Sequence, residues 1–114
     1  MFETKDIGNG YKLRSDGFVF CPFANSWHRG TPIDVSGGRR KKPKHYYKLL
    51  MPNKRGHNYV HRLVAQNFVP NPRPLLFDQV DHINGDSLDN DQTNLRWVTR
   101  QLNNMNRRQA GKIF

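Results

Sequence analysis

The chain has 114 residues, a formal net charge of +10 and a pI near 10.3. This length fits one domain, or one domain with an arm, and the 35% of hydrophobic residues can fill one small core. No apolar run approaches the roughly 18 residues of a membrane span, and the N-terminus lacks the apolar stretch of a secretory signal. The single cysteine, Cys21, cannot form an internal disulfide or a cysteine-rich zinc site. We therefore expect a cytoplasmic protein without structural zinc.

The excess of basic residues is the first indication of a partner. Nineteen Lys and Arg face nine Asp and Glu, a balance typical of proteins that bind a polyanion. Nucleic acid is the default partner, because no basic amphipathic helix favours a membrane surface. Five of the nine acidic residues lie between Asp78 and Asp91. A divalent cation between carboxylates and phosphate would explain this cluster, although a solvated acidic turn explains it on charge alone.

The first half of the chain predicts a small antiparallel β-meander. Residues 11–23 read as two extended segments separated by a turn at 15–17. Residues 24–44 are rich in Gly, Pro, Ser and charge, and they predict a long loop or mobile arm. Two further strands, joined as a hairpin, are expected at 45–51 and 57–60.

A dense basic run lies inside the predicted arm. Residues 37–44 hold five basic side chains in eight positions. A solvated loop is the simplest interpretation and a nuclear-localisation signal an unspecific one, but the charge of the whole chain favours an arm that contacts phosphates. The residues expected to contact nucleic acid here are Arg39, Arg40, Lys41, Lys42 and Lys44.

The second half of the chain predicts helix, connector, strand, loop, strand and helix in that order. Leu63, Val64 and Phe68 have helical spacing, and Thr99 is a suitable N-cap for the last helix. The expected ranges are 61–69 for the first helix, 80–83 and 95–98 for the strands, and about 100–108 for the last helix, with prolines in the connector and Asn84-Gly85 as a turn.

Three side chains of this half suit metal-assisted cleavage of a phosphodiester. Asp81 offers a hard oxygen ligand for Mg²⁺ or Mn²⁺, and His82 beside it can act as a general base near neutral pH. Asn103 falls about one turn inside the last helix, where it can share a metal ion with Asp81. Such an ion would keep most of its coordination sites for water and phosphate oxygens.

The position of Asp81 next to His82 sets a geometric condition. Neighbouring residues of a regular strand point to opposite faces, so these two side chains share a site only if the strand ends or bulges there. The Asn84-Gly85 turn favours an early end. Taken singly, an Asp-His pair is common and Asn94 would be interpreted as a turn or cap residue.

The order and spacing of four blocks resemble the HNH endonuclease family, in its phage-type homing-endonuclease branch. The match covers about residues 59–108. The resemblance implies an α+β fold, with an N-terminal small antiparallel β-meander followed by a ββα-metal (HNH) motif. The blocks are His61-Arg62-Leu63-Val64-Ala65 with Phe68-Val69-Pro70-Asn71-Pro72, then Val80-Asp81-His82-Ile83-Asn84-Gly85-Asp86, then Asn94-Leu95-Arg96-Trp97-Val98-Thr99, and finally Asn103 and Asn106.

The resemblance also implies a role for each site residue. His82 matches the general base, and Asp81 and Asn103 match the ligands of one divalent cation, Mg²⁺ or Mn²⁺. Asn94 matches the central Asn, which braces the loop and orients the histidine through hydrogen bonds. Cleavage would leave 5′-phosphate and 3′-hydroxyl ends.

The same resemblance divides the chain into two expected regions. Residues 1–58 would form a β-rich, basic, DNA-contacting region with the mobile arm at about 24–44, and residues 59–114 the nuclease core. Many HNH proteins bind a structural zinc through paired cysteines, and we expect none here. Because no helical recognition module follows the last helix in this sequence, target specificity is expected to come from the first region or to be low.

Several other side chains have two interpretations. Arg107 shares a helix face with Asn103, and a phosphate contact and a solvated surface position are equally supported. Arg96 is expected to pair with an acid or with DNA. His61 is expected to be buried and hydrogen-bonded. Core packing rather than base stacking is expected for at least two of Tyr46, Tyr47 and Trp27.

The sequence therefore predicts a metal-dependent endonuclease that nicks or cuts double-stranded DNA, without a small-molecule cofactor or a membrane partner. A non-catalytic DNA-binding or DNA-packaging accessory protein on the same fold is the alternative. The presence of both Asp81 and His82 favours the enzyme. An RNA-binding protein is supported by charge alone. The oligomeric state is open between a monomer and a weak dimer, and the expected location is the cytoplasm, that of the host if a phage encodes the protein.

Overall fold

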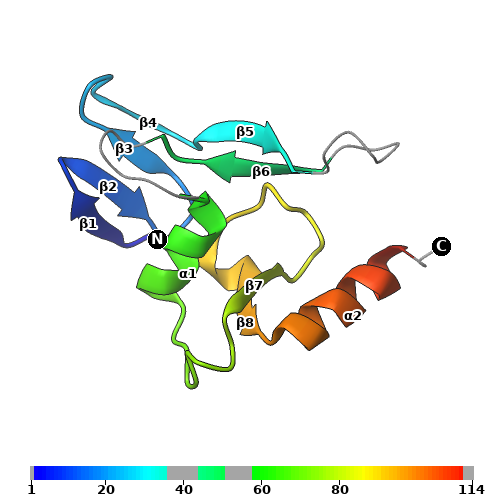
Figure 1. Ribbon diagram of the computed structural model, residues 1–114. Helices are drawn as coiled ribbons and strands as arrows, with labels where there is room; N and C mark the ends of the chain where they lie inside the picture. Colours follow the sequence, from blue (N-terminus) through cyan, green and yellow to red (C-terminus); the bar gives the residue numbers. More distant parts are fainter. Residues whose placement is uncertain (1, 36–43, 51–57, 112–114) are drawn as a thin grey trace.

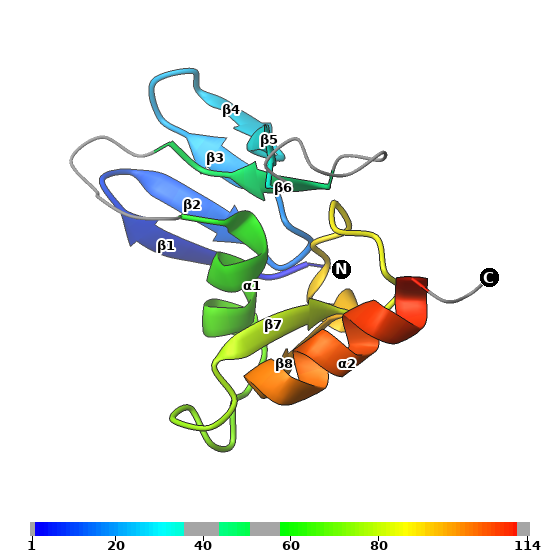
Figure 2. The same cartoon turned by 45° about the vertical axis from the view of Figure 1, so that its right-hand side comes forward.

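The computed structural model describes residues 2–35, 44–50 and 58–111, with side chains up to residue 105. Within these ranges, eight strands and two α-helices form an α+β fold with three antiparallel sheets. In both views helix α1 (Val60–Phe68) lies between the N-terminal strands and the strand pair that precedes the last helix (Figure 1, Figure 2). None of the helices in the described ranges has the length and hydropathy needed to cross a membrane.

The N-terminal meander is a four-stranded antiparallel sheet. Its second strand alternates buried Tyr11 and Leu13 with more exposed residues, so one face covers the core. The predicted turn at 15–17 is confirmed, and Gly17 adopts φ +94°, which favours glycine. In order across the sheet, the strands are β1 (Thr4–Gly8), β2 (Tyr11–Arg14), β3 (Val19–Cys21) and β4 (Ser26–His28).

Two of these strands differ from the sequence-based expectation. β1 was not predicted, because Ile7 is the one residue of this strand that is not exposed and the strand shows no apolar alternation. The loop predicted at 24–44 is wrong over β4 and over β5 (Thr31–Asp34). Pairing overrides the loop-like composition there: Trp27 pairs with Phe20 of β3. Residues 36–43 lie outside the described part of the chain.

The second sheet pairs β5 with β6 (His45–Lys48) rather than forming the expected 45–51 and 57–60 hairpin. Tyr59 makes a single antiparallel bridge to Lys48, and Val60 already belongs to α1. The predicted strand at 57–60 is thus reduced to this bridge and the bond from Leu49 N to the Asn58 carbonyl oxygen, and residues 51–57 lie outside the described part of the chain. The change of direction before β5 uses Gly30 at φ +100°, where a Cβ would lie 3.1 Å from the Lys48 carbonyl oxygen.

The C-terminal half closely follows the prediction. α1 begins one residue earlier than expected, and the last helix, α2 (Arg100–Gly111), extends three residues beyond its predicted end. The Thr99 N-cap is confirmed, because its Oγ1 accepts a hydrogen bond from Leu102 N at 3.1 Å. The elements between the helices are β7 (Gln79–His82), the short 3₁₀ helix η1 (Gln92–Asn94) and β8 (Leu95–Val98), with β7 and β8 paired antiparallel.

One hydrophobic cluster joins the N-terminal sheet to the second half of the chain. Leu13 and Val19 of the first sheet are fully buried together with Val60 and Val64 of α1, and Val80 of β7 belongs to the same cluster. The elements on either side of residue 58 therefore pack on a shared core, which fixes the N-terminal sheet relative to the β7–β8 pair. The proposed division at this residue stays a prediction.

Candidate functional site

The β7–β8 pair presents Asp81 and His82 at the end of a strand, as the turn signal predicted. The register is regular, with Asp81 opposite Arg96 and His82 opposite Leu95. β7 ends at His82, whose carbonyl oxygen accepts a hydrogen bond from Gly85 N at 3.0 Å. Because the pairing shows no bulge, neighbouring side chains leave the strand on opposite sides. Of the two conditions for a shared site, the end of the strand at His82 is therefore the one that is met.

His82 lies in a cluster of rings contributed by three different elements. Its ring centroid is 5.1 Å from that of His61 in α1, and 6.1 Å from that of Tyr46 in β6, with which it is stacked. Its Nε2 lies 2.8 Å from Asn90 Oδ1. Burial lowers the pKa of His82, although the hydrogen bond to Asn90 acts in the other direction. The imidazole is therefore neutral at neutral pH, as a general base must be.

His61 is the most strongly perturbed group of this cluster. Burial, and then the nearby charge of His82, lower the pKa of His61 to about 3. The prediction that His61 is buried is confirmed, but its Nδ1 is buried without a hydrogen-bond partner. The ring packs 4.7 Å from that of Tyr46 and 5.7 Å from that of Tyr59, measured between centroids. The His61 ring that packs against His82 is therefore uncharged at neutral pH.

Lys44 is the predicted DNA-binding residue whose side chain the structure describes. Its Nζ lies 5.3 Å from the centre of the Tyr46 ring, a cation–π geometry. Its positive charge lowers the pKa of both His61 and His82, after larger effects of burial. A cation therefore lies within electrostatic reach of the histidine pair. Arg39, Arg40, Lys41 and Lys42 lie outside the described residues, and Arg107 lies in α2 at a position where side chains are not described.

Asn94 braces the loop between β7 and β8. Its Nδ2 donates to Asn84 Oδ1 at 3.0 Å and to the Asp89 carbonyl oxygen at 2.9 Å. Its Oδ1 accepts from Asn84 N at 3.0 Å, and its own carbonyl oxygen accepts from Ile83 N at 2.8 Å. These bonds hold the loop closed on both sides of the turn.

The side chain bound to the His82 imidazole is Asn90, which is absent from the residues predicted from the sequence. It lies four positions before Asn94 in the same polar loop, and in the sequence it looks like one more turn residue. The loop also reaches β6, where Ser87 Oγ donates to the His45 carbonyl oxygen at 2.6 Å. Only folding brings this loop beside His82, so no local signal distinguishes Asn90.

The two predicted metal ligands lie on contacting elements, β7 and α2. Asp81 Oδ2 accepts a hydrogen bond from Arg96 Nε at 2.8 Å and pairs with Arg96 Nη2 at the same distance, which confirms that Arg96 pairs with an acid. The Asp81 side chain is 15% exposed and that of Arg96 is 46% exposed. Asn103 is 6% exposed, while its neighbours Leu102 and Asn104 are exposed. α2 therefore turns Asn103 inward.

The donor chemistry of Asp81 and Asn103 fits a hard divalent cation, because both offer oxygen ligands. In the described part of the chain, no group of three or more His, Cys, Asp and Glu residues could hold a metal. A cation here would keep several water ligands, as Mg²⁺ usually does. It would also compete with Arg96 for the Asp81 carboxylate.

Comparisons with known proteins find similar sequences and a similar fold. A family model described as HNH endonuclease matches residues 58–105, which include Asp81, His82, Asn90, Asn94 and Asn103. Two uncharacterized HNH endonucleases of Acanthamoeba polyphaga mimivirus are similar in sequence. One is 54% identical over 44 residues, 39% of this chain and 11% of the relative. The other is 32% identical over 98 residues, 83% of this chain and 26% of the relative.

The chain thus spans about a quarter or less of the curated relatives that it matches. A solved structure described as DNA binding and cleavage by the HNH homing endonuclease I-HmuI aligns with 98% of this chain and 61% of that one, with a TM-score of 0.68 and 30% identity. The similarity of fold therefore includes the N-terminal sheets as well as the segment around His82. Residues 58–105 of this chain therefore belong to the HNH endonuclease family.

Proposed function

We propose that this chain is a divalent-metal-dependent endonuclease that hydrolyses phosphodiester bonds of double-stranded DNA. The observation that carries the proposal is the half-buried, neutral His82 imidazole at the end of β7, held by Asn90 and adjacent to Asp81. The homing endonuclease with the similar fold is described as binding and cleaving DNA, and the net charge of +10 suits the same partner. The proposed location is the cytoplasm of the cell that holds the DNA.

His82 is the proposed general base. A water molecule beside its ring loses a proton to the imidazole and attacks the phosphorus, and the 3′-oxygen leaves, so that 5′-phosphate and 3′-hydroxyl ends result. Asp81 and Asn103 would hold the cation through a carboxylate and an amide oxygen. When bound, the ion supplies positive charge for the developing charge on phosphate. Burial against His61 and Tyr46 keeps the base uncharged until it acts.

Basic side chains are proposed to hold the DNA beside this site. Lys44 is the one whose side chain the structure describes, and its charge acts on both histidines. Arg39, Arg40, Lys41, Lys42 and Arg107 would contact phosphates further along the duplex. Arg96 has a double role in this scheme: it neutralises Asp81 in the metal-free protein, and its half-exposed guanidinium can turn to a phosphate when a cation takes the carboxylate.

Incubation with supercoiled plasmid tests the proposal. The chain is expected to nick or linearise the plasmid with Mg²⁺ or Mn²⁺, to lose activity in EDTA, and to lose it again when His82 is replaced (His82→Ala). His28→Ala, which removes an imidazole from β4, is the matched control and should cleave normally. Binding of DNA without cleavage under every metal condition would instead identify a non-catalytic DNA-binding protein. Equal activity of wild type and His82→Ala would remove His82 from the mechanism.

A further inference from the structure

We propose that Asn90 is a positioning residue that holds the His82 imidazole in the tautomer with the proton on Nε2, and that the turn at 15–17 of the N-terminal sheet holds Asn90 in place. The inference rests on the proposed function, in which His82 is the base. In a neutral imidazole one ring nitrogen carries the proton and the other the lone pair. A proton on Nε2 leaves the lone pair of Nδ1 for the attacking water.

The first support is the contact between the two side chains. Asn90 is 4% exposed, and its Oδ1 lies 2.8 Å from His82 Nε2. An amide oxygen can only accept a hydrogen bond, so with the Asn90 amide oriented as it is here, Nε2 is the nitrogen that donates. The Nδ2 of Asn90 is buried without a hydrogen-bond partner. A buried unpaired donor costs stability, and a group retained at that cost calls for a functional explanation.

The second support is the backbone that packs against Asn90. A Cβ added to Gly17 would lie 2.8 Å from Asn90 Cβ and 3.1 Å from the Asn90 carbonyl oxygen. Such separations leave no room for any side chain at this position. Two residues beyond Asn90, Gln92 N donates to the Ser15 carbonyl oxygen at 2.8 Å. The turn of the first sheet therefore lies directly against the segment that carries Asn90.

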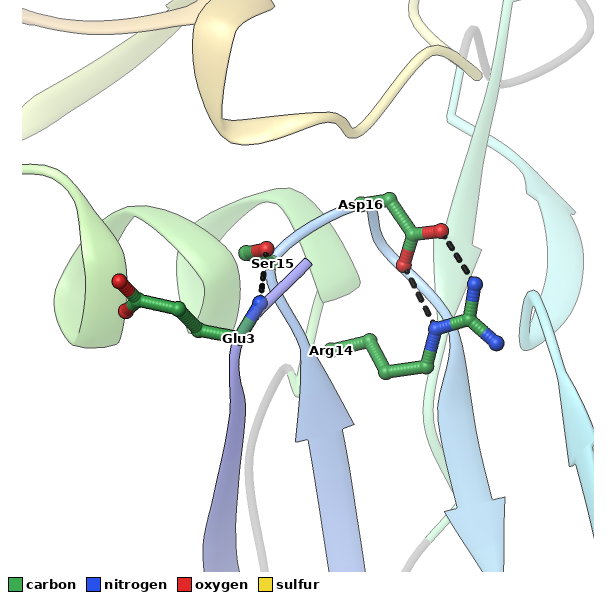
Figure 3. Close-up of polar contacts among 4 residues, drawn as sticks. All are labelled: Glu3, Arg14, Ser15 and Asp16. Atoms are coloured by element: carbon green, nitrogen blue, oxygen red, sulfur yellow. Dashed lines mark hydrogen bonds and ion pairs between the residues drawn. The ribbon is translucent and has the colours of Figure 1, made fainter. Parts of the chain in front are cut away.

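The third support is the rigidity of that turn. Arg14 pairs with Asp16 through two bonds, Nε to Oδ1 at 3.0 Å and Nη2 to Oδ2 at 2.5 Å (Figure 3). Ser15 Oγ accepts a hydrogen bond from Glu3 N at 2.8 Å, which joins the turn to the start of β1 (Figure 3). A turn fixed by these contacts can hold Asn90, and through it the imidazole, in one orientation.

Nuclear magnetic resonance of the full chain without metal or DNA tests the tautomer directly. In ¹⁵N-labelled wild type at pH 8, the signals that disappear in His82→Ala identify the His82 ring. Nε2 is expected to carry the proton and Nδ1 to be unprotonated. Asn90→Ala should shift both nitrogens toward the average of the two tautomers, whereas Asn90→Asp, which keeps an accepting oxygen, should retain the wild-type pattern.

The glycine of the turn offers a matched pair of variants. Gly17→Ala and Gly8→Ala both place a side chain at positive φ, +94° and +101°, but a Cβ at Gly8 meets nothing within 4 Å. Gly17→Ala is therefore expected to disturb the His82 tautomer and Gly8→Ala to leave it unchanged. An equal effect of the two variants would show that general loss of stability, not contact with Asn90, is responsible.

Cleavage kinetics give the second readout. Asn90→Ala is expected to lower kcat about tenfold, part of the factor that general-base catalysis supplies, with KM for DNA unchanged because the residue is buried. Asn67→Ala, which removes a side-chain bond on α1, should leave both constants unchanged. An unprotonated Nε2 in the wild type would overturn the inference. So would an Asn90→Ala variant in which both the tautomer and kcat are unchanged. Absence of cleavage in wild type would defeat the proposed function alone, because the tautomer is measured without catalysis.

Discussion

At the scale of single residues, the unusual feature is a buried histidine, His61, packed against a half-buried one, His82. Imidazoles tolerate this arrangement when both stay neutral, and the lowered pKa of each meets that condition. Tyr46 packs against both rings, with its centroid 4.7 Å from that of His61 and 6.1 Å from that of His82. The residues around His82 thus keep its imidazole neutral before any substrate binds.

The pKa of His61 near 3 predicts how stability depends on pH. The unfolded chain protonates this histidine near pH 6.5 and the folded chain only near pH 3, so the unfolded chain binds more protons between these values. Acidification over this window should lower the free energy of unfolding by up to about 1.4 kcal/mol per pH unit. The charged or titratable groups that act on His61 are His82, Arg62 and Lys44.

Urea unfolding followed by circular dichroism at several pH values between 7.5 and 4 measures this dependence. His61→Leu should reduce the loss of unfolding free energy on acidification. Part of the loss will remain, because His82 also has a lowered pKa. An equally steep fall in the variant would show that other groups dominate the acid response.

At the scale of elements, α2 contacts β7 and turns Asn103 inward. The helix begins directly after β8, and Thr99 lies between them as its N-cap. The Thr99 carbonyl oxygen also accepts the first helical bond, from Asn103 N at 2.9 Å. The start of the helix and the position of the proposed ligand are therefore set by the same residue.

Removal of the cap should accordingly affect stability and metal use together. Thr99→Ala is expected to lower the free energy of unfolding by about 1 kcal/mol, and to raise the Mg²⁺ concentration needed for half-maximal cleavage. Thr31→Ala, on exposed β5, is the control for loss of a threonine outside a helix cap. Unchanged stability and an unchanged metal requirement would show that α2 does not depend on this cap.

Element by element, local signals predicted the second half of the chain better than the first. Pro70, Asn84-Gly85 and Thr99 act within a few residues of themselves, so the ends of α1, β7 and β8 were predicted closely. β1 and β4 exist because neighbouring strands pair with them. Their own residues are mostly exposed and carry no period-two pattern, which is why the sequence did not predict them.

At the scale of the whole molecule, the N-terminal sheet shares a core with α1 and also supports the loop that carries Asn90. The basic run at 37–44 is joined to this framework through Lys44, which lies beside Tyr46. Positive charge on the first half of the chain would thus guide DNA toward the end of β7. Electrostatic contacts of this kind make binding depend strongly on salt.

Charge reversal in the basic run tests this arrangement. Lys41→Glu combined with Lys42→Glu is expected to weaken DNA binding and to reduce the slope of log Kd against log salt by roughly two, if each lysine contacts one phosphate. Arg73→Glu, in the connector after α1, is the charge control. A slope equal to that of wild type, measured by fluorescence anisotropy, would show that these lysines do not contact phosphate.

The sequence by itself determined the charge and the order of elements in the second half, because these depend on composition or on short-range spacing, and its resemblance to HNH endonucleases predicted Asp81, His82, Asn94 and Asn103 as site residues. The tertiary structure alone decided that Asn90, Tyr46 and His61 contact the His82 imidazole and that Arg96 forms an ion pair with the Asp81 carboxylate. These contacts join the first sheets, α1 and the loop before η1. Pairing and core packing bring such distant segments together, and no local propensity encodes which side chains then meet.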